Sequence, residues 1–191
     1  MAERTVWTRQ HPAVLEELER TGRYIAREEA IRAKNGGGEM AEFYLKLYRW
    51  YSREGARFVP KPADVEYPVW VSLSQESMLQ PVEGTVVLTL SVPEEALLIT
   101  DMERWGYRVN QWYIPKDQED EKQHNTELER YGIANEGALV DSDKGNFYPL
   151  LRNKILKSWD RLFTTPPRPG DMAQATLWEL RREWLREVVY G

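Results

Sequence analysis

The sequence has no cysteine among its 191 residues, and its only histidines are His11 and His124. The lack of cysteine excludes disulfides, thiolate zinc sites and cysteine nucleophiles. Two imidazoles are too few for a multi-histidine metal site, so we expect no bound metal. No apolar run approaches the length of a transmembrane helix, and the N-terminus has no apolar leader. We therefore expect a cytoplasmic protein that does not enter the membrane.

The chain has only a small net charge, because its basic and acidic residues nearly balance. The 26 basic and 31 acidic side chains leave a formal charge of -5, which argues against a large nucleic-acid footprint but allows a local basic patch. Hydrophobic residues make up 41% of the chain, enough for a real core, and the length favours one domain over residues 1–191. Tryptophan and tyrosine are the unusual presence, with eight and ten copies.

Strands and helices are expected in an irregular order along the chain. Pro12 favours the start of a helix, because the N–H group that proline lacks would have no partner in the first helical turn. Gly22 favours the end of that helix, because glycine adopts a positive φ without strain. His11 is expected to cap this helix. Because strands and helices do not alternate regularly, the prediction is an α+β domain rather than a doubly wound parallel sheet. The expected strands cover residues 4–8, 67–73, 85–92 and 97–99, and the expected helices cover 12–22 and 40–55.

The second half of the chain is expected to contain a charged insertion around residues 116–146, in which His124 would be solvated. A helix with an apolar stripe follows, and the stripe is expected to be buried. The tail from residue 172 fits two strands or one long helix, and Thr176 with the Val188-Val189-Tyr190 ending slightly favours strands. The stripe comprises Phe147, Leu150, Leu151, Ile155, Trp159, Leu162 and Phe163.

No single motif identifies a reaction. Asn35 and the three glycines after it lack both the preceding strand and the lysine of a phosphate-binding loop, so they are interpreted as a flexible loop. Most tryptophans are expected to fill the core. A few lie at strand ends or in irregular segments, where they could instead stack on a flat ring: Trp7, Trp70, Trp105 and Trp112.

Two carboxylates, Asp101 and Glu179, each follow an apolar, strand-like run. A sheet delivers a polar group to a cleft at such positions, although a surface carboxylate at a strand end is the commoner case. The basic residues of the helix near residue 155 are interleaved with acidic ones, so a solvated surface is expected there rather than a nucleic-acid groove.

The order of several short motifs resembles an uncharacterised bacterial family, a domain of unknown function. The resemblance covers nearly the whole chain and implies no particular chemistry. The motifs are Trp7-Thr8-x-Gln10, Gly22, Tyr67-Pro68-x-Trp70, Asp101 followed by Asn110 and Tyr113, Lys157-Ser158-Trp159, and Gln174-Ala175-Thr176-x-Trp178.

A more distant likeness is to the ADP-ribosyltransferase fold, in particular to toxins that modify DNA bases. The sequence is similar to those toxins at four places: Trp7-Thr8, the helix that ends at Gly22, Trp70-Val71-Ser72 and Gln174-Ala175-Thr176. The resemblance implies a split sheet with flanking helices, an NAD cofactor and an aromatic-lined cleft. It places Trp7, Thr8, Trp70 and Ser72 on the nicotinamide side, with Gln174, Thr176 and Glu179 across from them. Gln10 is expected as a further cofactor-binding residue.

Thr176 stands where that fold has its catalytic glutamate. Threonine cannot act as a base as a carboxylate does, so Glu179 or Asp101 would have to supply the acid–base group. The expected function is therefore an ADP-ribosyltransferase-like domain that binds NAD and modifies a macromolecule. The alternatives are a non-catalytic module for a nucleotide or nucleic acid, and a protein-interaction domain with exposed Trp105 and Trp112.

Overall fold

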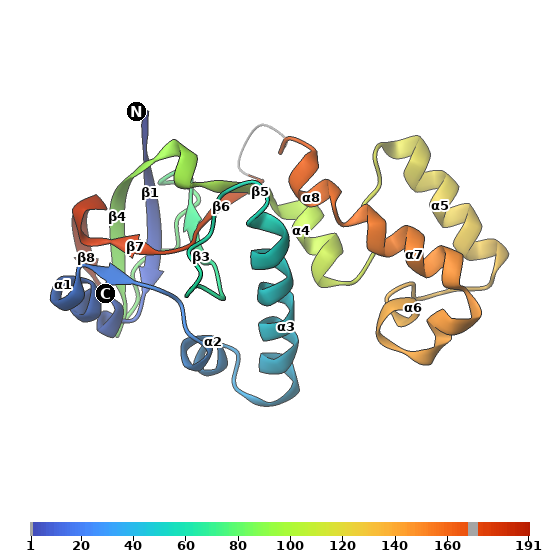
Figure 1. Ribbon diagram of the computed structural model, residues 1–191, viewed down its shortest axis with the longest axis horizontal. Coiled ribbons are helices and arrows are strands. Elements are labelled where there is room, and N and C mark those ends of the chain that lie inside the picture. Colours follow the sequence, from blue (N-terminus) through green and yellow to red (C-terminus); the bar gives the residue numbers. More distant parts are fainter. Residues whose placement is uncertain (1, 168–171) are drawn as a thin grey trace. The chain divides into compact units, whose positions relative to one another are not determined.

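The computed structural model describes residues 2–167 and 172–191. The chain forms two compact units (Figure 1). The first unit combines the chain up to Ile99 with its C-terminal segment, and the second comprises Thr100–Pro167. A mainly antiparallel sheet flanked by helices confirms the predicted α+β class.

The first unit begins as its local sequence predicts. The side chain of His11 accepts a hydrogen bond from the backbone N–H of Ala13, which caps the first helix as expected. That helix ends at Gly22, whose φ of 80° lets its N–H bond the carbonyl of Leu18 at 2.9 Å. The elements are β1 (Glu3–Gln10), α1 (Pro12–Thr21), β2 (Arg23–Tyr24), α2 (Glu28–Lys34), α3 (Gly38–Gly55), β3 (Val69–Ser72), β4 (Val86–Pro93), η1 (Glu94–Ala96), β5 (Leu98–Asp101), β6 (Ala173–Leu177), β7 (Leu180–Arg181), η3 (Arg182–Trp184) and β8 (Leu185–Tyr190).

Six of these strands form one sheet in the order β5-β6-β3-β1-β4-β8, and β2 pairs with β7 in a second, two-stranded sheet (Figure 1). The tail therefore forms strands, as the β-branched residues near its end favour. β1 and β4 pair in antiparallel register along eight residues, from Glu3↔Pro93 to Gln10↔Val86. This register fixes which side chains share each face, because a shift of one residue would turn every side chain to the other side.

The main core lies on one face of the six-stranded sheet. Val6, Leu88 and Leu90 from β1 and β4 are fully buried there, together with Leu18 of α1. The alternation of apolar and polar residues along β1 and β4 directs their apolar side chains to this face. α3 packs elsewhere, because its Tyr51 contacts Trp70 and Thr176, which point to the opposite face of the sheet.

The second unit is helical. Its elements are α4 (Met102–Val109), α5 (Gln118–Arg130), α6 (Ala138–Asp141), η2 (Asp143–Phe147), α7 (Pro149–Ser158) and α8 (Arg161–Thr164). The charged stretch near residue 120 forms α5, so the segment 116–146 lies within this unit.

Two expectations for the second unit are wrong. His124 is only 2% exposed rather than solvated. Its ring stacks on the Tyr113 ring with 4.1 Å between the centroids, and its Nε2 lies 2.7 Å from a carboxylate oxygen of Glu136. Phe147 and Leu150 are 80% and 84% exposed, although they fit the apolar stripe of α7. The buried side of α7 carries Leu151 and Ile155 instead, so helical spacing found the helix but not the full extent of its buried face.

Candidate functional site

Three of the short motifs lie side by side on neighbouring strands of the first unit. Trp7 on β1 pairs with Ser72 on β3, and Ser72 pairs with Gln174 on β6. Residues directly opposite one another in antiparallel strands direct their side chains to the same face of the sheet. Trp7, Ser72 and Gln174 therefore form a row across three strands, from segments more than 160 residues apart in the sequence.

The row continues across two further strands. Trp7 also pairs with Thr89 on β4, and Thr89 pairs with Glu187 on β8. We call these five residues, Gln174, Ser72, Trp7, Thr89 and Glu187, the cross-strand row. Glu187 is exposed, and no partner for its carboxylate is found among the residues that the structure describes. Sequence reasoning missed Glu187, because no local signal indicates that β8 pairs with β4.

Two expected binding residues, Thr8 and Gln10, point to the opposite, core-side face. The hydroxyl of Thr8 donates a hydrogen bond to the carbonyl of Trp70 at 2.9 Å, and the amide of Gln10 donates to Thr8 at 2.7 Å. Thr8 is only 5% exposed. The structure therefore does not bring this pair to the cross-strand row. The Thr8 bond links β1 to β3, and the Gln10 bond holds the Thr8 hydroxyl within β1.

Thr176 and Trp70 share the face of the row but lie under α3. Thr176 is 1% exposed, and its hydroxyl lies 3.1 Å from the hydroxyl of Tyr51. The Tyr51 ring packs against Trp70 at 5.3 Å between centroids and against Trp178 at 6.4 Å. Burial raises the pKa of the neighbouring Tyr48 to about 12. The position that matches a catalytic glutamate is thus covered by a helix.

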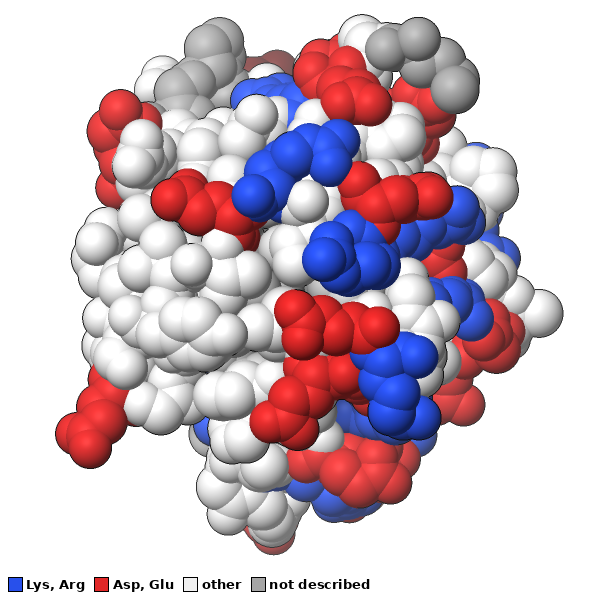
Figure 2. Space-filling view, turned by 90° about the vertical axis from the view of Figure 1, so that its left-hand side faces the viewer, with Lys and Arg blue, Asp and Glu red and all other residues white. Residues whose placement is uncertain are grey.

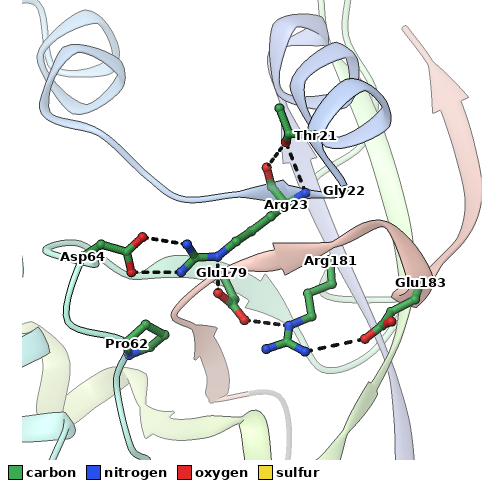
Figure 3. Close-up of a pocket in the computed structure, with 8 residues that line it drawn as sticks. All are labelled: Thr21, Gly22, Arg23, Pro62, Asp64, Glu179, Arg181 and Glu183. Atoms are coloured by element: carbon green, nitrogen blue, oxygen red, sulfur yellow. Dashed lines mark hydrogen bonds and ion pairs between the residues drawn. The ribbon is translucent and has the colours of Figure 1, made fainter.

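Glu179 lies in an open pocket of about 540 Å³ in the first unit, at the β2–β7 sheet (Figure 3). One carboxylate oxygen accepts from Nε of Arg23 at 2.5 Å, and the other accepts from Nε of Arg181 at 2.6 Å. Arg23 also pairs with Asp64, and Arg181 lies 3.6 Å from Glu183, so charges alternate along this wall (Figure 3).

This alternation limits what Glu179 can do. Hydrogen bonds from Arg23 to Asp64 and to Glu179 hold the pKa of the guanidinium above its ordinary value, so Arg23 stays charged. Both oxygens of Glu179 are engaged, and its side chain is only 9% exposed. Proton transfer at Glu179 would require an arginine to move away. These contacts hold β2 against β7, because Arg23 of β2 and Arg181 of β7 lie directly opposite each other in the two-stranded sheet.

Asp101, the other expected acid–base residue, begins α4. Its Oδ1 accepts hydrogen bonds from the backbone N–H groups of Glu103 at 3.0 Å and Arg104 at 3.1 Å. The side chain is 1% exposed. These bonds satisfy two of the donors that a helix leaves unpaired at its N-terminus, so Asp101 acts as an N-cap.

Two further tryptophans with an expected role in binding lie in the second unit. Trp105 is 8% exposed and belongs to the interior, whereas Trp112 is 42% exposed. The carbonyl of Trp112 accepts a hydrogen bond from the indole of Trp159 at 2.8 Å. Of the two, Trp112 alone offers a broad exposed surface.

The surface charges are mixed on the face that Figure 2 shows, where Lys and Arg side chains lie directly beside Asp and Glu. Within residues 2–167 and 172–191, no group of three or more histidine or acidic side chains is placed to hold a metal ion. The helices of the same described residues include none with the length and apolar character needed to cross a membrane.

Comparisons with known proteins identify the family but not the chemistry. No curated protein and no solved structure matches the chain. The likeness to ADP-ribosyltransferases therefore stays a prediction. The model of one family, the domain of unknown function DUF3841, matches residues 5–186, which is nearly the whole chain, and the protein therefore belongs to the DUF3841 family.

Proposed function

We propose that the first unit is an ADP-ribosyltransferase-like domain that binds NAD along the cross-strand row. The observation that carries this proposal is the register that aligns Trp7, Ser72 and Gln174 on adjacent strands. The distant likeness to ADP-ribosyltransferases rests on these same motifs, and they are separate in the sequence. Their meeting on one face supports a shared ligand.

The chemistry of the row suits a dinucleotide. The half-exposed indole of Trp7 offers a flat apolar surface for a ring such as nicotinamide. The amide of Gln174 can donate to and accept from a carboxamide, and the exposed carboxylate of Glu187 can accept from ribose hydroxyls. Five strands at the usual spacing span roughly 19 Å, which leaves room for an extended ligand rather than a single ring.

The reaction that we propose at this site is transfer of ADP-ribose to a macromolecule. The bond between the ribose C1′ and the nicotinamide nitrogen breaks, and nicotinamide leaves with the bonding electrons. A nucleophile of the acceptor forms the new bond at C1′ and gives its proton to a carboxylate. We assign this role to Glu187, because Asp101 caps a helix and Glu179 is held by two arginines.

Binding is tested by thermal denaturation of the full chain with and without millimolar NAD. A ligand at a hundred times its dissociation constant stabilises the folded state by roughly 2.7 kcal/mol. The shift is expected to disappear in Trp7→Leu and to persist in Trp112→Leu, a matched loss of an exposed tryptophan in the second unit. An absent shift in the wild type, or an equal shift in Trp7→Leu, would overturn the NAD site.

Catalysis is tested separately by nicotinamide release. Glu187→Gln is expected to lower the release rate at least tenfold, whereas Glu183→Gln, an equal change at another exposed glutamate, should leave it unchanged. Release that is insensitive to Glu187→Gln would remove Glu187 from the mechanism.

A non-catalytic nucleotide-binding module is the second candidate. The burial of Thr176 under Tyr51 favours it, because the position of the expected glutamate has neither a carboxylate nor access to a ligand. An NAD-induced thermal shift without nicotinamide release, in the wild type and in Glu187→Gln alike, would select this alternative.

A further inference from the structure

The second unit contains a basic pocket that the proposed NAD site does not use. Its volume is about 420 Å³. The lining residues of α7 and of the start of α8 recur at helical spacing, so they form one continuous face. We call it the Tyr113 pocket, and it is lined by Tyr113, Leu150, Asn153, Lys154, Lys157, Ser158 and Arg161.

Three cations line this pocket, and two of them are held in place. Nζ of Lys154 lies 2.7 Å from Glu127, and the guanidinium of Arg161 donates to the backbone carbonyl of Ile114. Both cations lie 5.1 Å from the centroid of the Tyr113 ring. Lys157 is exposed, and within the described part of the chain its ammonium group has no carboxylate partner.

The base of the pocket is the buried ring of Tyr113. Tyr113 is 4% exposed, stacks on His124, and donates its hydroxyl proton to Asp120 at 2.8 Å. Burial raises the pKa of this hydroxyl, so Tyr113 adds no negative charge near neutral pH. Asp120 is itself 3.8 Å from Arg161. The lining side chains of the pocket thus include three positive charges and no negative one.

The rim of the pocket is apolar and unusually exposed. Leu150 lines it and is 84% exposed. A large apolar side chain with this much exposure, next to the unpaired ammonium group of Lys157, suits a ligand with an anionic group and an apolar ring.

We propose that the Tyr113 pocket binds the phosphate group of a nucleotide, either free or at the 5′ end of a nucleic-acid chain. Lys157 supplies the uncompensated positive charge, Lys154 and Arg161 can donate hydrogen bonds to the phosphate oxygens although each also pairs with a carboxylate, and the amide of Asn153 donates to one of these oxygens. Leu150 contacts the base. The proposal does not depend on NAD binding by the first unit.

The test measures binding of the full chain to a hexathymidylate with a 5′ phosphate, labelled at its 3′ end, by fluorescence anisotropy at low salt. Lys157→Gln is expected to weaken binding at least tenfold. Lys122→Gln, which removes the same charge from an exposed site on α5, should change it less than twofold. Circular dichroism of both variants checks that they fold.

Competition then distinguishes the two sources of the phosphate. Displacement by AMP at equal strength indicates a free nucleotide, whereas tighter binding of the phosphorylated oligonucleotide indicates a chain end. Equal binding of a 5′-hydroxyl oligonucleotide, equal losses in Lys157→Gln and Lys122→Gln, or no binding by the wild type would each overturn the proposal. Loss of the NAD-induced thermal shift in Trp7→Leu, with oligonucleotide binding intact, would separate the two sites.

Discussion

Replacement of Tyr51 by phenylalanine removes one oxygen from the interface between α3 and the sheet. Tyr51 is 0% exposed and Thr176 is 1% exposed, and their hydroxyls lie 3.1 Å apart. Phenylalanine fills the same space, so no cavity forms, but the buried hydroxyl of Thr176 loses this partner. The expected cost is about 1–3 kcal/mol in the free energy of unfolding. For a chain of this length, a loss of 2 kcal/mol lowers Tm by about 4–8 °C.

A double-mutant cycle isolates the bond itself. Thr176→Val removes the other hydroxyl at nearly constant volume, and the double variant replaces both groups by apolar ones. Urea denaturation followed by tryptophan fluorescence should show that the double variant loses less stability than the sum of the two single variants. Strictly additive losses, or single losses below about 0.5 kcal/mol, would refute the assignment of this bond as a stabilising contact.

Three further outcomes follow from the structure. Leu88→Ala is expected to destabilise the first unit by about 2–5 kcal/mol in urea denaturation, because Leu88 is fully buried in the core, and a smaller loss would contradict that burial. Asp101→Ala removes the cap of α4 and should cost about 0.5–2 kcal/mol while the NAD-induced shift persists; loss of that shift would return Asp101 to the binding site. Burial raises the pKa of Tyr48 to about 12 in the folded state, so between pH 10 and 12 the unfolded chain releases a proton that the folded chain retains. Stability should fall in this window by up to about 1.4 kcal/mol per pH unit, and Tyr48→Phe should reduce that slope in pH-dependent denaturation; an unchanged slope would exclude Tyr48 as its source.

Local chemistry in the sequence was sufficient for many elements of the first unit. The cap at His11 and the end of α1 at Gly22 depend on neighbours within four residues, and both were predicted correctly. The strands near the C-terminus follow from β-branched residues in a short window. The α+β class then follows from the order of the elements, because an irregular order excludes a doubly wound sheet.

The resemblance to ADP-ribosyltransferases is only a prediction, and it rests on motifs that contain Trp7, Ser72 and Gln174, which the strand register places in one row. The same motifs include Thr8, and the Trp-Thr-x-Gln motif of the uncharacterised family adds Gln10; the strand alternation turns both side chains to the core side. A motif records which residues occur together, but not the face to which each side chain points. That depends on the register with neighbouring strands.

Properties that depend on distant partners were decided only by the tertiary structure. His124 lies in a highly charged helix, yet Tyr113 and Glu136 bury it, and Glu179 meets Arg23 only because β2 pairs with β7. Glu187 reaches the row of Trp7 through the pairing of β8 with β4, to which no local signal points. The sequence by itself determined the first helix with its cap and end, the helix α3 and most strands of the six-stranded sheet, because those depend on neighbouring residues. It missed α4, which contains the segment around Trp105 that was expected to be irregular. The tertiary structure decided which charges are engaged and which are free, because contacts between remote segments set the surroundings of a side chain.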